Sequence, residues 1–168
     1  MIGRAVLALT FASALGSGLV AGIFFAFSTF VMAALARLQP AEGIAAMQSI
    51  NVTVINPIFF AAFLGTAGLC VILAVMALAR WGEPGAIPLL CGSVLYLVGV
   101  LLVTGIFNVP MNDALAAAVP HSPEGAALWT RYLADWTAWN HVRTIAPLLA
   151  SAAFIAALCL QFEALGSD

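Results

Sequence analysis

The chain has 168 residues, of which 64% are hydrophobic and only 7% are charged, and its net charge is -2. A soluble domain has about a quarter charged residues, so this chain cannot present a water-soluble surface and is predicted to be an integral membrane protein. It contains no lysine, and its five basic residues are scattered arginines. This excludes the basic surface that a nucleic-acid-binding protein needs.

Four apolar runs follow one another along the chain, at residues 5–36, 57–79, 86–107 and 144–162. A helix needs roughly 20 apolar residues to cross the hydrocarbon core. The first run is longer than the roughly 7–15 residues of a signal-peptide core, so we interpret it as a true span. In lipid only helices or closed barrels satisfy the backbone, and these runs lack the alternation of barrel strands. We therefore predict an all-α fold.

The predicted architecture is a transmembrane four-helix bundle, with a polar cluster and short extra helices at one end, forming a single domain over residues 1–168. Asn56 before Pro57, and Ser122 before Pro123, are typical of helix starts. The helix from Pro123 can continue through the fourth run because no proline interrupts it before Pro147. Pro110 is expected to bend or end the third helix.

Small residues and cysteines in the spans have structural interpretations. Ala14, Gly18, Gly22 and Ala26 recur every four residues, which favours close helix packing and also permits a homo-oligomer. Three cysteines lie singly within apolar runs, so we interpret them as buried small hydrophobic residues and not as a disulfide or metal framework. They are Cys70, Cys91 and Cys159.

Four antiparallel spans bring three polar segments to one end of the bundle. These are the connection before the second span, the end of the third span and the start of the fourth span. Their polar residues include Gln48, Asn51, Asn56, Asn108, Asn112, Asp113 and the stretch DWTAWNHVRT at 135–144. The opposite end has only the termini and a turn containing Arg80. The positive-inside rule slightly favours both termini in the cytoplasm of a multi-pass protein of the cell or inner membrane.

Helical spacing predicts an inward-facing stripe in the fourth helix. Its members are Leu128, Tyr132, Trp136, Asn140, Arg143 and Pro147, and Thr137, His141 and Thr144 form a neighbouring stripe. A charge at the edge of an apolar span is costly unless it is paired, and Asp113 is the expected partner of Arg143. This polar cluster is either a structural clamp between helices or a working site.

Other polar and aromatic residues also have two interpretations. An interfacial aromatic belt accounts for Trp81 and Trp129, and partly for Trp136 and Trp139. His121 is expected to be solvated. The histidines lack metal-ligand spacing, although a haem held by His141 as its single axial ligand is compatible with the sequence.

Five segments resemble the anthrone oxygenase family. They are GLVAGIFFAFSTFVM, AAMQSINVTVINPIF, FLGTAG, LYLVGVLLVTGIFNVPMNDAL and WTRYLADWTAWNHVRT, which together cover nearly the whole chain. The resemblance implies oxidation of an anthrone to an anthraquinone without a recognised cofactor motif. It assigns the motif residues Asn51, Asn56, Asn108 and Asn112 and the cluster Trp139, Asn140, His141 and Arg143.

This chemistry needs three features, and the sequence offers candidates for each. A flat apolar pocket could be lined by Trp136, Trp139 and Phe107. A base is needed to remove the acidic proton, and His141 is the first candidate and Asp113 the second. Donors to the developing oxyanion are needed as well. The candidate donors are Arg143, Asn108, Asn112 and Asn140.

The predicted function is therefore cofactor-independent oxidation of a hydrophobic phenolic or polyketide-type compound to a quinone. The expected partners are the lipid bilayer, the hydrophobic small molecule and O2, without nucleic acid and without a metal. The alternatives are a non-enzymatic membrane module that binds a quinone, haem or lipid or transports a small solute, and a purely structural bundle.

Overall fold

The computed structural model describes residues 2–166, and it has helices joined by short turns, with no strand in that range. The predicted all-α fold is confirmed. The elements in chain order are α1 (Ile2–Ala26), the π-helix η1 (Phe27–Val31), α2 (Met32–Leu35), α3 (Pro40–Thr53), α4 (Pro57–Ala79), α5 (Ala86–Tyr96), the π-helices η2 (Leu97–Leu102) and η3 (Thr104–Asn108), α6 (Val109–Ala116) and α7 (Pro123–Gly166).

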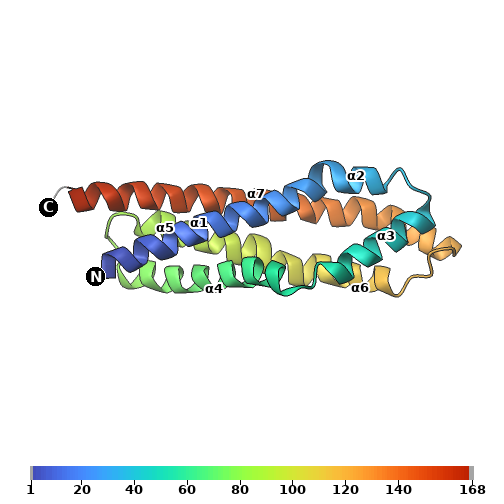
Figure 1. The fold of residues 1–168 in the computed structure, drawn as a ribbon, viewed down its shortest axis with the longest axis horizontal. Coiled ribbons are helices and arrows are strands. Elements are labelled where there is room, and N and C mark those ends of the chain that lie inside the picture. The colour runs from blue at the N-terminus through green and yellow to red at the C-terminus, as the bar shows by residue number, and fades with distance from the viewer. Residues whose placement is uncertain (1, 167–168) are drawn as a thin grey trace.

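Four continuous helical stretches are long and apolar enough to cross a membrane. They are Gly3–Leu35, Pro57–Ala79, Ala86–Ala116 and Pro123–Glu163. Both described ends of the chain and the α4–α5 turn lie at one end of the elongated bundle (Figure 1). α2, α3, α6 and the start of α7 lie at the other end, which we call the α3 end. The polar segments therefore gather at one end, as the alternating topology predicted.

The bundle is longer than a bilayer is thick. α7 has 44 residues, which gives about 66 Å at 1.5 Å per residue, against about 30 Å for the hydrocarbon core. The segment from Arg143 to Gln161 alone spans about 27 Å. If Gln161 lies at one membrane boundary, Arg143 lies close to the other, and the first half of α7 extends beyond the hydrocarbon.

Local signals set the helix starts where the sequence predicted them. The Asn56 side chain accepts a hydrogen bond from the Phe59 N–H at 3.0 Å, and Pro57 follows as the first helical residue. The Ser122 hydroxyl accepts one from the Gly125 N–H at 2.9 Å. α7 then runs without a break through Pro147, as expected.

The third helix does not end at Pro110, although a proline was expected to bend or end it there. Ala86–Ala116 form one continuous helical stretch that includes α6. The two π-helices come just before the proline, and the Val109 N–H donates to the Thr104 carbonyl five residues earlier. A π-turn widens the helix, so a proline without an N–H can be accommodated at the start of the next α-helical turn. As a result Asn108 and Asn112, four residues apart, lie on one side of a continuous helix.

Two apolar clusters fill the bundle. The larger one occupies the membrane-spanning part and includes Tyr96 and Phe154, which are completely buried. There the Tyr96 hydroxyl donates to the Phe63 carbonyl at 3.0 Å. The smaller one, which we call the end cluster, lies at the α3 end. It consists of Met32, Leu35, Ile44, Met47, Leu115, Trp129, Tyr132 and Trp136.

The tryptophans fit an interfacial belt less well than expected. Trp81 is exposed, but Trp129 is buried against α3. A Cβ added at Gly43 would lie 2.8 Å from the Trp129 ring, so the missing side chain of Gly43 is what lets α3 cover that ring. The cysteine prediction also needs correction, since Cys70 is buried while Cys91 and Cys159 are exposed and all three are free thiols.

The small-residue stripe of α1 packs partly against α7. Ala14 is buried, and its carbonyl accepts a hydrogen bond from the Ser151 hydroxyl at 2.9 Å. Gly18 lies beside the same serine, whereas Gly22 is exposed. The stripe therefore serves packing within the chain in its first half.

Gly99→Ala is expected to destabilise the bundle, because the added Cβ would overlap the Cβ of Ala146 on α7. Overpacking of a closed contact costs about 1–3 kcal/mol. Gly105→Ala is the matched control in the same span, since nothing lies within 4 Å of its added Cβ. Thermal unfolding in detergent measures both variants, and equal melting temperatures would contradict the close η2–α7 contact.

Candidate functional site

Arg143 is buried inside the bundle at the boundary between the two apolar clusters, with 4% of its surface exposed. Its guanidinium carbon lies 4.4 Å from the ring centre of Phe24 and 4.8 Å from that of Trp136. Nη2 donates to Asn140 Oδ1 at 2.8 Å, and Nη1 donates to Thr104 Oγ1 at 3.4 Å. Nε is buried without a hydrogen-bond partner. Two aromatic faces and two neutral oxygens therefore surround this cation.

The expected ion pair between Asp113 and Arg143 is not formed. Asp113 is exposed, and Arg143 has no acidic partner within residues 2–166. The reason is helical geometry: Asn112 points into the bundle, and the next residue is rotated by about 100° around the helix. A buried charge without a counter-ion is costly, which makes it a candidate functional group.

Two asparagines behind Arg143 hold the helices in register. Asn140 Nδ2 donates to the Phe24 carbonyl and to Ser28 Oγ, both at 2.8 Å, which joins α7 to the first span. Asn108 Nδ2 donates to the Trp136 carbonyl at 3.3 Å, which joins the third span to α7. Both side chains are completely buried. The Asn140 oxygen that faces Arg143 is thus fixed by bonds to another helix.

Asn112 fixes the aromatic side chains beside Arg143. Its Oδ1 accepts hydrogen bonds from the Tyr132 hydroxyl and from Trp136 Nε1, both at 2.8 Å. The two rings are stacked, with centroids 5.9 Å apart and planes 20° apart. Phe27 also packs against Trp136, with ring centroids 5.8 Å apart and planes 57° apart. This arrangement orients the Trp136 ring toward the guanidinium.

An apolar cavity of about 230 Å³ lies beside these groups. An engineered apolar cavity of about 150 Å³ holds benzene, so this one can hold more than a single ring. Arg143 is the one ionisable residue in its lining within the described part of the chain. The lining residues are Ile23, Phe24, Phe27, Met47, Ile50, Asn51, Val54, Ile55, Phe59, Phe60, Phe63, Thr104, Val109, Asn112, Trp136 and Arg143.

The structure brings some of the sequence-predicted residues to the cavity and leaves others away from it. Asn51, Asn112, Trp136 and Arg143 line it. Asn108 and Asn140 lie buried behind the lining, as described above. Asn56 caps α4. Trp139 is stacked on Phe107, with centroids 3.5 Å apart, and neither ring lines the cavity.

His141 is exposed and does not line the cavity. It is two residues from Arg143, and side chains at that spacing do not share a helix face. The inward-facing stripe itself is confirmed, because Tyr132, Trp136, Asn140 and Arg143 are all buried. His141 belongs to the neighbouring stripe and faces away from the cavity that Trp136 and Arg143 line.

Sequence reasoning missed the contributions of the first span and of Thr104. Phe24, Phe27 and Ser28 all contact the site residues, although they come from a run that has no charged residue. A usable signal was present: the pair Ser28-Thr29 and the single Thr104 are polar residues near those ends of the first and third runs that lie at the α3 end.

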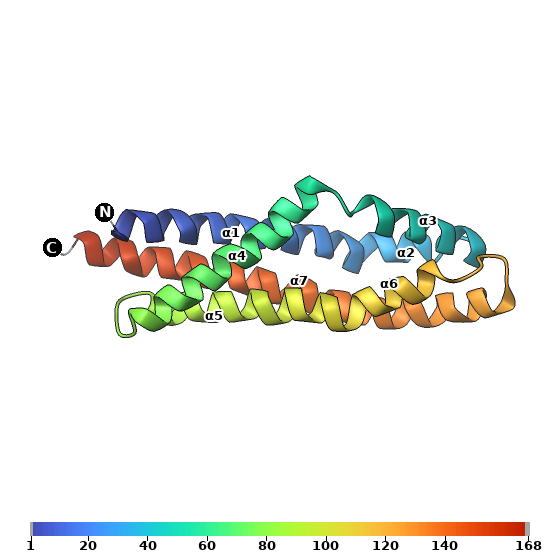
Figure 2. The ribbon, with the colours of Figure 1, turned by 90° about the horizontal axis from the view of Figure 1, so that it is seen from below.

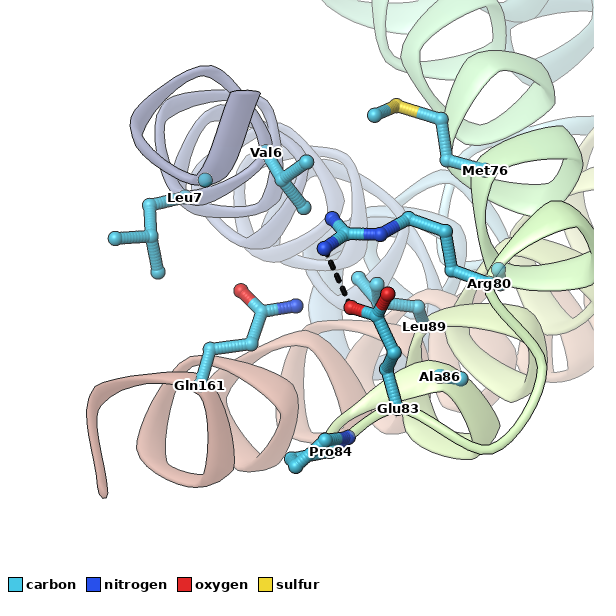
Figure 3. A pocket seen from close by; sticks show the side chains of 11 residues that line it. Val6, Leu7, Met76, Arg80, Glu83, Pro84, Ala86, Leu89 and Gln161 are labelled. Carbon is cyan, nitrogen blue, oxygen red and sulfur yellow. Dashed lines mark ion pairs between the residues drawn. The ribbon is translucent and has the colours of Figure 1, made fainter. Parts of the chain in front are cut away.

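A second cavity, of about 240 Å³, lies at the opposite end of the bundle (Figure 3). It is bordered by Arg80, Glu83 and Gln161, and the first two form an ion pair. The charge of Arg80 is thus balanced within the protein, unlike that of Arg143. Within residues 2–166 no group of three or more His, Cys, Asp or Glu side chains could hold a metal ion.

The fold and the site are those of a multi-pass helical membrane protein with an internal aromatic cavity that has one buried cation in its wall. Residues 58–153 match the model of the anthrone oxygenase family, which is more than half of the chain, and the protein belongs to that family. The match covers Asn108, Asn112, Asn140 and Arg143 but not Phe24 or Asn51. Searches of curated proteins and of solved structures gave no match.

Proposed function

We propose that the protein oxidises a hydrophobic phenolic or polyketide-type compound with O2 to a quinone, in the cavity beside Arg143. The observation that supports this most is the buried arginine without a counter-ion in an otherwise apolar and amide-lined wall. Membership of the anthrone oxygenase family supports the same chemistry.

The reaction has a simple balance. An anthrone methylene plus O2 gives a quinone carbonyl plus water. The methylene first loses a proton to give an electron-rich anion whose charge is delocalised onto the ring oxygen. The anion transfers one electron to O2, and the resulting radical and superoxide join through a new carbon–oxygen bond. The protonated hydroperoxide then loses water, as its O–O bond and the remaining C–H bond break.

The role of the protein is to favour the anion and to hold it in place. Arg143 lies where a negatively charged oxygen would be stabilised most, because a buried cation in a low-dielectric site interacts strongly with developing charge. The rings of Trp136 and Phe27 in the lining suit an aromatic ligand, and the amides of Asn51 and Asn112 can orient its oxygens. The lining has no carboxylate or imidazole, so we assign the proton to a water molecule held within the cavity, from which it returns to the peroxide oxygen.

Oxygen uptake tests this function. The purified protein in nanodiscs should accelerate oxygen consumption by an anthrone, such as emodin anthrone, above the spontaneous rate, with the quinone as product. Protein-free nanodiscs are the control. A rate equal to that control, with the protein folded, would overturn the proposal.

His141→Ala is expected to retain most of this rate, because the imidazole is exposed and outside the cavity. General-base catalysis contributes about 10²–10⁴-fold, so loss of a true base would be easily visible. A rate within about twofold of the wild type agrees with water as the proton acceptor. A loss of that larger size would instead restore the base role that the sequence suggested for His141.

A further inference from the structure

We infer that the cavity receives its ligand sideways from the bilayer, as an uncharged molecule dissolved in lipid, through a mouth between the α3–α4 connection and the start of α6. The inference rests on the proposed function for the nature of the ligand. It concerns the route to the cavity and the ionisation state in which the ligand arrives.

The end cluster closes the direct route from water at the α3 end. Ile44, Met47 and Leu115 are completely buried there, and Trp129 and Tyr132 stack beneath α3 with centroids 5.6 Å apart. Hydrogen bonds hold this cover in place. Gln48 Nε2, on α3, donates to the carbonyls of Leu115 at 2.8 Å and Ala118 at 3.2 Å.

The membrane-spanning core closes the route from the other end. Phe63 forms part of the cavity floor, and its carbonyl is bonded to the buried Tyr96 hydroxyl. Beyond it, Leu73, Val100 and Phe154 are completely buried. A ligand from that side would have to pass through a close-packed interior.

The side of the bundle is where the lining reaches the surface. Ile55, Phe60 and Val109 line the cavity and are also 67%, 39% and 41% exposed. Ile55 lies in the connection between α3 and α4, and Val109 begins α6. Figure 2 shows the start of α4 standing away from α6, whereas its other end lies beside α5. These residues therefore form the rim of a lateral mouth.

The surface around the mouth is apolar, which indicates lipid rather than water. Val52 and Ile58, which flank Ile55 in sequence, are 73% and 85% exposed. Exposed apolar patches of this kind mark surfaces that contact a membrane or a partner. With Gln161 at one boundary of the hydrocarbon, Arg143 and the mouth lie at the depth of the other boundary.

A molecule that takes this route must be neutral on the way, because charge in the hydrocarbon is strongly disfavoured. Arg143 stands at the inner wall and would favour ionisation only after the ligand has entered. The geometry thus separates transport from activation: a weak carbon acid or phenol arrives uncharged and becomes an anion beside the guanidinium.

Mouth variants test the route. Ile55→Trp and Val109→Trp narrow the rim, and each should lower kcat/KM for the anthrone by about tenfold, within the range over which association rates vary. Val52→Trp and Ile58→Trp are matched controls, because these side chains are at least as exposed but do not line the cavity. Equal kcat/KM for rim and control variants would overturn lateral access.

A lipid-tethered probe gives a readout that is independent of turnover. An anthraquinone attached to the acyl chain of a phospholipid cannot leave the bilayer, and light makes it label nearby C–H groups. Labelling of Met47 or Ile50, blocked by Ile55→Trp, is the expected result. Labelling by free but not by tethered anthraquinone would overturn lateral access while leaving the proposed function intact. Labelling by neither would overturn both.

Discussion

Arg143→Met should abolish most of the oxygen uptake with an anthrone while leaving the protein folded. The loss should be about 10²–10³-fold, the usual effect of removing one strong donor to a developing oxyanion. Methionine keeps much of the apolar stem that packs between Phe24 and Trp136 but removes the cation. Oxygen consumption and quinone absorbance measure the effect.

The same variant should not lower the melting temperature appreciably. The charge of Arg143 is buried without a carboxylate, so its removal relieves a desolvation penalty. The loss of the donor to Asn140 Oδ1 costs about 1–3 kcal/mol and offsets part of that gain. An inactive but stable variant would show that Arg143 belongs to a working site and is not only a structural clamp between helices.

Arg131→Met is the matched control, because Arg131 is an exposed arginine on the same helix. It should change neither the rate nor the melting temperature. If Arg143→Met instead unfolds the protein, or lowers its stability by several kcal/mol, the clamp interpretation is the correct one. Full activity of the folded variant would remove Arg143 from the proposed mechanism.

The inward-facing stripe of α7 was predictable because one uninterrupted helix fixes the angular relation of residues three and four apart. Tyr132, Trp136, Asn140 and Arg143 follow that spacing and are all buried. The gathering of polar segments at one end followed from the alternating direction of the spans. Both predictions needed only local geometry and chain order.

Partners across helices were not predictable in the same way. A rotation of about 100° separates Asn112, which faces inward, from Asp113, which does not. The sequence gives no reason to prefer one of these neighbours, since Pro110 suggested a helix end just before them. The π-turns of η3 keep the helix continuous and set which way Asn112 and Asp113 face. No residue pattern in the apolar run predicts these turns.

The cavity itself depends on long-range packing. Phe24 and Phe27 are more than 100 residues from Arg143 in the chain, and Asn51 comes from α3, a short helix in the connection before the second span. Residues of α3, of α4 and of the turn between them (Val54 and Ile55) line the cavity together. The cavity therefore depends on how α3 and α4 are placed relative to each other, and no single sequence motif predicts that placement.

Asn112→Leu should cost both stability and activity, because one oxygen accepts hydrogen bonds from two buried donors. The variant leaves the Tyr132 hydroxyl and Trp136 Nε1 unpaired, at about 1–3 kcal/mol for each donor. It also frees the Trp136 ring that lies over Arg143, so the rate should fall by at least about tenfold. Thermal unfolding and oxygen uptake measure the two effects.

Two further variants separate the hydrogen bonds from the shape of the side chain. Asn112→Asp keeps an acceptor oxygen and should lose less stability than Asn112→Leu. Tyr132→Phe removes one of the two donors, so in the double variant with Asn112→Leu one fewer donor is left unpaired. The Tyr132→Phe substitution should therefore cost less in the Asn112→Leu background than alone, a coupling of about 0.5–3 kcal/mol. Strictly additive losses would mean that the hydrogen bond between Tyr132 and Asn112 contributes nothing to stability and that Asn112 acts on Tyr132 through packing alone.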